Sequence, residues 1–250
     1  MIDPVFLRVI IQTGILISVA YASGSLVYYK DVKVNYTRKI NHFALFFVPM
    51  FLDNILPVEP SIESIIIGSF LAVGSLIIYI KPVRNKSRII QRMFLSFDRP
   101  EDRPNTLLWL STQITVGYLI LIPIMIYFFT FGYGDLILIP ILVNGIGDGL
   151  AEPVGVRFGR IKYKTYALFS KITYERTVEG SACVFFTSII VIIFFHSGFT
   201  SSEFICALII FPIVMTLAEA FAPHTWDTPF LFLFGFLTIY IVKIMPFVSH

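Results

Sequence analysis

Two carboxylates stand four residues apart at the end of a hydrophobic run. The segment ILVNGIGDGLAEPVGVRFGR, residues 141–160, begins with apolar side chains, carries Asp148 and Glu152 in its middle and ends with two arginines. Residues four apart lie on one face of a helix, so we predict that the two carboxylates point the same way. Carboxylates hold Mg²⁺, and a metal ion with Lys or Arg neutralises a polyphosphate, which is the combination that phosphoryl transfer needs.

Glycines at every second position surround the first of these acids. Gly145, Gly147 and Gly149 remove side chains around Asp148. This predicts either a phosphate that approaches the backbone closely or a surface on which another helix packs. The run is not a dinucleotide-binding fingerprint, because the glycines alternate and no βαβ pattern surrounds them.

The composition indicates a membrane protein. Of the 250 residues, 56% are hydrophobic and only 14% are charged, whereas an ordinary soluble domain carries roughly a quarter charged residues. The two cysteines lie inside apolar runs and predict neither a disulfide framework nor a metal site. The first run starts almost at Met1 without a basic start or a small-residue cleavage site, so we expect no cleavable signal peptide.

The hydrophobic runs predict an all-α fold, a polytopic bundle of about eight transmembrane helices in one integral-membrane domain over residues 1–250. About 20 helical residues cross the ~30 Å hydrocarbon core, and runs of this length recur along the chain. The predicted spans cover residues 4–29, 40–56, 61–80, 106–131, 134–154, 179–198, 201–221 and 228–248.

Basic residues alternate between the connections. Seventeen of the 19 Lys and Arg residues fall in the first, third and fifth connections. The positive-inside rule therefore places these connections in the cytoplasm and both termini outside. Acids at membrane depth cost ~2.5–3.5 kcal/mol each at the centre and usually carry function, so their gathering at one face favours a functional site over isolated salt bridges. The acids that this threading gathers at the cytoplasmic face are Asp148, Glu152, Glu179, Glu219 and Asp227.

The third connection carries apolar residues at helical spacing among arginines. Two interpretations stay open: an interfacial helix on the cytoplasmic leaflet, or a solvated basic loop attracted to anionic lipid. The apolar residues are Ile89, Ile90, Met93, Phe94 and Phe97.

Several segments resemble, in order, the core motifs of the dolichol kinase/phytol kinase family. They are GDGLAEPVGVRFGR, ERTVEGSACVFF and TLAEAFAPHTWDTPF, and upstream YTRKINHFALFF resembles the family's Arg-Lys-x-x-His element. The resemblance covers roughly residues 36–235. Members of this family are membrane enzymes that phosphorylate long-chain lipid alcohols, typically with CTP, and they include a CTP-dependent diacylglycerol kinase.

The resemblance implies a role for each matched residue. Asp148 belongs to the Gly-Asp pair of the nucleotide and metal site, and we predict Glu152 and Glu179 as its partners in catalysis and Mg²⁺ binding. Further site residues are Asn144, Glu219 and Asp227. Arg176 stands where lysine is usual, Thr177 where serine is usual, and Thr228 where asparagine is common. The predicted nucleotide-binding residues are Arg38, Lys39, His42, Arg157, Gly159, Arg160, Lys162, Lys164, Arg176, Gly180 and Ser181. For His42, a packing role and a phosphate contact both stay open.

The predicted reaction is in-line attack by a lipid hydroxyl on the γ-phosphorus of CTP, with Mg²⁺ as cofactor. The acceptor is an isoprenoid alcohol, phytol-like or polyprenol-like, or diacylglycerol, and no nucleic acid is involved. The enzyme is expected in the plasma membrane of a prokaryote or an internal membrane of a eukaryote, with the site facing the cytoplasm.

Two other functions are considered. A phosphatidate cytidylyltransferase also uses CTP, but its signature continues to an Asp-Arg-x-Asp cluster that APHTWDTPFLF lacks. A transporter or lipid-binding membrane protein also buries acids, but it more naturally places them near mid-membrane than at one face.

Overall fold

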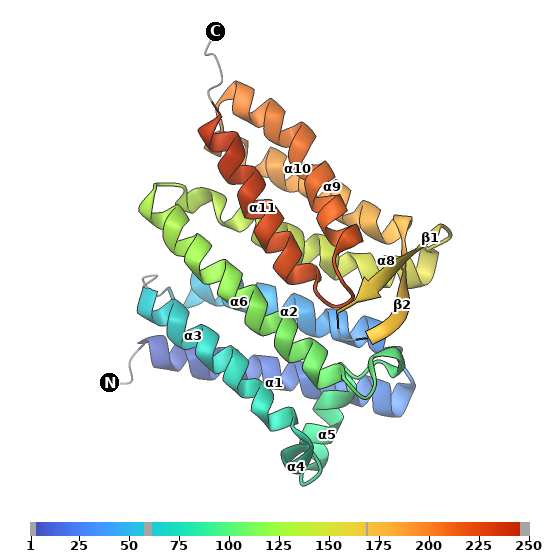
Figure 1. The fold of residues 1–250 in the computed structure, drawn as a ribbon. Helices are drawn as coiled ribbons and strands as arrows, with labels where there is room; N and C mark the ends of the chain where they lie inside the picture. Colours follow the sequence, from blue (N-terminus) through green and yellow to red (C-terminus); the bar gives the residue numbers. More distant parts are fainter. Residues whose placement is uncertain (1–3, 58–61, 169, 246–250) are drawn as a thin grey trace. The chain divides into compact units, whose positions relative to one another are not determined.

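The computed structural model describes residues 4–57, 62–168 and 170–245 and is 80% helical (Figure 1). The chain divides into two compact units, Met1–Thr115 and Val116–His250, which are described in turn. Figure 1 labels the main elements of both units.

The first unit is a set of helices in which α1 packs against α2 and α5. Gly24 of α1 makes the second contact possible, because a Cβ there would overlap the backbone oxygen of Arg92. The elements of this unit are α1 (Pro4–Lys30), α2 (Val34–Ile55), α3 (Ile62–Ser75), η1 (Leu76–Tyr79), α4 (Lys81–Arg84), α5 (Arg88–Leu95), η2 (Pro100–Asp102) and the beginning of α6 (Thr106–Thr130).

The amphipathic pattern in the third predicted connection forms helix α5. Ser87 caps its first turn by accepting a hydrogen bond from the backbone N–H of Ile90, 3.4 Å away. Met93 and Phe94 of α5 are buried in a cluster with Ala20 and Tyr79. These two side chains therefore pack inside the protein, and a position of α5 on the cytoplasmic leaflet stays a prediction.

The second unit is built around three helices, α9, α10 and α11. Helix α10 packs against both α9 and α11, and the segment η4–α8 also packs against α9. Phe211, Met215 and Phe236 fill the core between these helices and are fully buried. The elements of this unit are the rest of α6, η3 (Gly134–Leu136), α7 (Leu138–Leu142), η4 (Val143–Asp148), α8 (Gly149–Phe158), β1 (Lys162–Ala167), β2 (Ser170–Thr177), α9 (Val178–Phe194), η5 (His196–Gly198), α10 (Ser201–Phe221) and α11 (Asp227–Ile244).

Within the described residues, each predicted span coincides with a helical segment. Residues 61 and 246–248 of the predicted spans lie outside the described part of the chain. Helix α2 begins at Val34, before the predicted residue 40, so part of the predicted first connection is helical. Five of the described helical segments are long and apolar enough to cross a membrane, which is compatible with a multi-pass membrane protein: Pro4–Lys30, Thr106–Thr130, Gly134–Phe158, Ser201–Phe221 and Asp227–Ile244.

An antiparallel β-hairpin corrects the prediction of an all-α fold. Strands β1 and β2 pair between α8 and α9, with Tyr163 opposite Arg176 and Thr165 opposite Tyr174. These four side chains turn toward the helices, whereas alternate residues such as Lys164 are exposed. Alternation of this kind is typical of a half-buried strand, and Tyr and Thr favour strands. The sequence prediction treated this stretch as a basic loop and overlooked the alternation.

Candidate functional site

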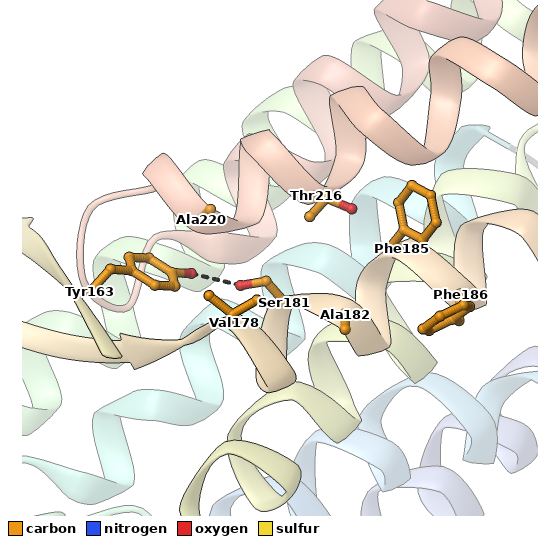
Figure 2. A pocket seen from close by; sticks show the side chains of 8 residues that line it. All are labelled: Tyr163, Val178, Ser181, Ala182, Phe185, Phe186, Thr216 and Ala220. Atoms are coloured by element: carbon orange, nitrogen blue, oxygen red, sulfur yellow. Dashed lines mark hydrogen bonds between the residues drawn. The ribbon is translucent and has the colours of Figure 1, made fainter. Parts of the chain in front are cut away.

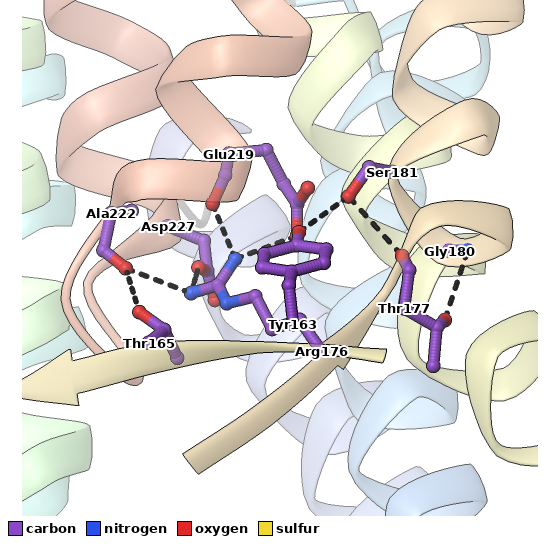
Figure 3. A network of polar contacts seen from close by, with 9 residues as sticks. All are labelled: Tyr163, Thr165, Arg176, Thr177, Gly180, Ser181, Glu219, Ala222 and Asp227. Carbon is purple, nitrogen blue, oxygen red and sulfur yellow. Dashed lines mark hydrogen bonds and ion pairs between the residues drawn. The ribbon is translucent and has the colours of Figure 1, made fainter. Parts of the chain in front are cut away.

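Arg176 on β2 is the centre of a buried cluster of ion pairs (Figure 3). Its guanidinium donates a hydrogen bond to Oε1 of Glu219 at 2.6 Å and another to Oδ1 of Asp227. It also donates to the backbone oxygens of Glu219 and, at 3.1 Å, Ala222. The three charged side chains are only 12%, 6% and 11% exposed. Arg176 therefore links the hairpin to the end of α10 and the start of α11 through hydrogen bonds.

The cluster holds more negative than positive charge. Burial disfavours the charged form of Arg176, but the carboxylates of Asp227 and Glu219 outweigh this effect and raise its pKa further above its usual range. Asp148, also buried, interacts electrostatically with Glu219. The second carboxylate oxygen of Glu219, Oε2, is buried and accepts no hydrogen bond from the described residues, although the hydroxyl of Ser181 interacts with the Glu219 carboxyl group. Buried polar atoms normally have partners, so this oxygen is a candidate contact for a ligand.

Two hydroxyl groups of β1 extend the cluster. The hydroxyl oxygen of Tyr163 lies 2.6 Å from Oγ of Ser181 on α9, and Thr165 donates to the backbone oxygen of Ala222 at 3.0 Å. Burial raises the pKa of Tyr163 to about 12, so this side chain stays a neutral hydroxyl at physiological pH. Sequence reasoning missed Tyr163 and Thr165, although their alternation with Lys162 and Lys164 was a usable signal.

The matched glycines allow close packing around the first turn of α9. A Cβ on Gly180 would lie 2.7 Å from the backbone oxygen of Ala151, and one on Gly155 would lie 2.7 Å from Oγ1 of Thr177. A Cβ on Gly147 would lie 3.0 Å from Cα of Val184 on α9. For Gly147, the structure therefore favours the helix-packing alternative.

The same turn carries the acid Glu179. Its carboxylate accepts hydrogen bonds from the backbone N–H groups of Arg160 at 2.9 Å and Ile161 at 3.3 Å. Thr177 caps α9 through a hydrogen bond from the N–H of Gly180 to its Oγ1, 3.1 Å long. Glu179 thus holds the turn between α8 and β1 against the start of α9.

The predicted phosphate-binding cations of the second unit divide into two groups. Arg157, Arg160, Lys162 and Lys164 are exposed, at the end of α8 and on the outward side of β1. Lys162 donates to Oε2 of Glu175 at 2.8 Å across the hairpin. Arg176 instead faces inward and is surrounded by acids.

Asn144 and Asp148 lie in the π-helical segment η4, and both are buried. Segments of this kind occur frequently at functional sites. The hydroxyl of Thr228 on α11 donates to Oδ1 of Asn144, 3.4 Å away. Glu152 follows in the first turn of α8 and is half-buried. Asn144 therefore contacts the first turn of α11, and Asp148 lies close enough to the cluster around Arg176 to interact electrostatically with Glu219.

Three predicted site residues, Arg38, Lys39 and His42, belong to the first unit and lie on α2. Lys39 is buried. The ring of His42 contacts that of Phe46 on the same helix, with 4.8 Å between the ring centroids. This contact suits the packing role of His42, and a phosphate contact stays a prediction.

Among the described residues, no group of three or more His, Cys, Asp or Glu side chains is placed to hold a metal ion. Mg²⁺ usually keeps several water ligands and binds one or two carboxylates together with substrate phosphates. Asp148 and Glu152 lie four residues apart across the junction of η4 and α8, and their binding of a metal ion that arrives with a nucleotide stays a prediction. Glu179, the third predicted ligand, is engaged by backbone N–H groups.

A scan against protein-family models and a search of the curated proteins found no match for this chain. The resemblance to the dolichol kinase/phytol kinase family therefore stays a prediction, carried by the quoted segments alone.

Proposed function

We propose that this protein is a membrane kinase with eight spans that transfers the γ-phosphate of CTP to a lipid alcohol at the cytoplasmic face. The observation that carries the proposal is that direct contacts join the three later segments that resemble the kinase family. Arg176 in the second segment binds Glu219 and Asp227 in the third. Glu179 in the second segment accepts a hydrogen bond from the backbone of Arg160, which ends the first.

The exposed cations supply the charge that a triphosphate needs. Arg157, Arg160 and Lys164 lie within a short stretch at the end of α8 and on the outer face of β1. Arginine forks bind phosphate oxygens through two parallel hydrogen bonds, and lysine adds a point charge. We assign these side chains to the CTP phosphates. Arg176 instead binds the buried acids Glu219 and Asp227.

The transfer step exchanges one P–O bond for another. The lipid hydroxyl oxygen bonds to the γ-phosphorus, the bond from that phosphorus to the bridging oxygen breaks, and CDP leaves. The hydroxyl proton passes to a carboxylate of the site. Mg²⁺, held by Asp148 and Glu152 together with the phosphates, would neutralise charge that develops on the transferred group.

The products distinguish this reaction from that of a cytidylyltransferase. A kinase attacks the γ-phosphorus and yields CDP and a lipid monophosphate, whereas a cytidylyltransferase attacks the α-phosphorus and yields pyrophosphate and a CDP-lipid. Purified protein is incubated with Mg²⁺ and CTP carrying a label on either the γ-phosphate or the cytosine. The acceptors are phytol, geranylgeraniol, a polyprenol, diacylglycerol and phosphatidate.

We expect the γ-label to enter the lipid phase and the cytosine label to stay in water. The reverse distribution would establish the cytidylyltransferase and refute the kinase. If neither label enters lipid with any acceptor, the proposal is also wrong and a transporter or lipid-binding protein becomes the leading candidate.

A further inference from the structure

The β-hairpin lies across the ends of helices α9, α10 and α11. Thr177 of β2 caps the start of α9, and Thr165 of β1 donates a hydrogen bond at 3.0 Å to the backbone oxygen of Ala222, the residue after α10. Figure 2 shows a further contact with α9, in which the hydroxyl groups of Tyr163 and Ser181 point toward each other with 2.6 Å between their oxygens. The buried ion pairs add the start of α11. One face of the hairpin is therefore turned toward the helix ends.

The helix ends cover only part of this face on strand β2. Side chains at every second position of a strand lie on one face, so Ile172, Tyr174 and Arg176 lie on the same side of β2. Tyr174 is 8% exposed and the side chain of Arg176 is 12% exposed, whereas Ile172 is 62% exposed. Beyond Tyr174 the hairpin therefore extends past the helix ends, with Ile172 still on the face that is turned toward them.

The part of the hairpin that extends past the helices combines apolar side chains with a lysine. The residues that we call the hairpin tip are all exposed: Tyr166, Leu168, Lys171 and Ile172. The backbone N–H of His224 donates to the oxygen of Tyr166 at 2.7 Å, so the tip starts beside the connection between α10 and α11. The sequence has no Asp or Glu between Lys164 and Glu175. The tip therefore carries a positive charge, and its lysine is not among the cations assigned to CTP.

Helices α10 and α11 relate the hairpin tip to a membrane. Both are long and apolar enough to cross one, so a face turned toward their ends is also turned toward the bilayer. Where this face extends past the helices, it meets lipid head groups. Phe221, the last residue of α10, is 70% exposed and suits lipid surroundings at the same level. Apolar side chains beside a lysine are the combination that binds an anionic membrane surface.

We propose that the hairpin tip binds anionic phospholipids of the cytoplasmic leaflet. Leu168 and Ile172 enter the interfacial layer of the membrane, and Lys171 contacts the phosphate groups of the lipids. The strand that carries Arg176 is then held at one end by the helices and at the other by the leaflet. This inference rests on α10 and α11 crossing the membrane, and it does not require the kinase reaction.

The first measurement locates the hairpin tip relative to the bilayer. A spin label is attached to Ile172→Cys in a protein that also carries Cys183→Ala and Cys206→Ala, and Leu168→Cys gives a second position in the tip. The matched control is Thr173→Cys, because Thr173 is also exposed but lies on the opposite face of β2. Size-exclusion chromatography verifies that each labelled protein is folded.

The labelled proteins are placed in nanodiscs that contain phosphatidylglycerol. Oxygen concentrates in the bilayer, whereas a nickel chelate stays in water, so the ratio of their collision rates with the label reports its depth. We expect this ratio to be several-fold higher for a label at residue 172 or 168 than for one at residue 173.

The second measurement tests the charge of the lipid. Nanodiscs of phosphatidylcholine alone remove the anionic head groups, and Lys171→Gln removes the cation. One lysine near an anionic leaflet changes binding about fivefold. We therefore expect either change to lower the ratio of membrane-inserted to water-exposed label at residue 172 about fivefold. Lys86→Gln, which removes an exposed lysine of the first unit, serves as the control and leaves this ratio unchanged.

Three results would overturn the proposal. Equal access of the nickel chelate to residues 172 and 173 would place the hairpin tip in water. Access of neither reagent to residue 172 would show that another part of the chain, or a second copy of it, covers the tip. An unchanged ratio in phosphatidylcholine alone would refute the anionic lipid as the partner. None of these measurements uses CTP or an alcohol, so their outcome is independent of the kinase proposal.

Discussion

Replacing Arg176 with methionine tests whether its ion pairs hold the hairpin on the helices. Methionine keeps a long unbranched side chain but leaves Glu219 and Asp227 buried without the guanidinium that binds both. Removing one partner of a buried ion pair costs about 3–5 kcal/mol, because the remaining charge is uncompensated. In a chain of this size 1 kcal/mol shifts the unfolding midpoint by about 2–4 °C, so we expect a decrease of ~6–20 °C.

The control is an ion pair of similar length on the same hairpin. Lys162 lies 2.8 Å from Glu175, but these side chains are 59% and 58% exposed. Exposed pairs contribute little, because water solvates both charges. Lys162→Met should therefore leave the unfolding midpoint close to that of the wild-type protein.

The assay heats the purified protein in detergent and measures the folded fraction by size-exclusion chromatography. A triple variant, Arg176→Met with Glu219→Gln and Asp227→Asn, removes the excess charge and should recover most of the lost stability. If Arg176→Met and Lys162→Met have the same unfolding midpoint, the ion pairs of Arg176 do not hold the hairpin on the helices. If the triple variant melts no higher than Arg176→Met, an uncompensated charge is not the cause of the loss.

Three further predictions concern packing, catalysis and pH. Gly24→Ala should lower the unfolding midpoint, because the new Cβ would overlap the backbone of Arg92; Gly14→Ala, on the same helix with no atom within 4 Å of the new Cβ, should leave it unchanged or raise it. Asp148→Asn and Glu179→Gln should each lower γ-phosphate transfer at least ~100-fold while the protein stays folded; wild-type turnover in either variant would assign that acid a structural role only. Burial raises the pKa of Tyr163 from 10.0 to about 12. Above pH 10 the unfolded state therefore releases a proton that the folded state retains, and stability should fall as the pH rises toward 12. In denaturant titrations, the free energy of unfolding of Tyr163→Phe should fall less over this pH range than that of the wild-type protein. An equal fall would contradict the assignment of the pH dependence to Tyr163.

The helical part of the fold was predictable because its signal is local. Long apolar runs favour helices wherever they occur, and each predicted span coincides with a described helical segment. Helix length alone does not give the number of crossings, because α9 is apolar but shorter than the other long helices of its unit. Whether the chain crosses eight times stays a prediction.

The hairpin and its cluster were not predicted, because their contacts join distant parts of the chain. Arg176 reaches Glu219 and Asp227 across 43 and 51 residues. The alternation of basic connections along the chain predicted that these acids lie at one end of the helices. It did not predict which cation binds them. Because residues 155–178 were predicted as a loop, Arg176 was not identified as the partner of these acids. In the strand β2, side chains alternate, so Arg176 turns to the opposite side from its neighbour Glu175.

The hairpin also explains how one basic stretch supplies two kinds of cation. Side chains of a strand alternate between its faces, so Arg176 turns inward to two acids while Lys162 and Lys164 turn outward. An inward lysine would bind Glu219 and Asp227 less well, because an ammonium group is a compact charge whereas a guanidinium forms several hydrogen bonds in a fixed plane. Arginine at this position, where the resemblance to the kinase family implies lysine, therefore agrees with a bridge between two carboxylates. If the residue instead bound phosphate alone, Arg176→Lys would retain both stability and affinity for CTP.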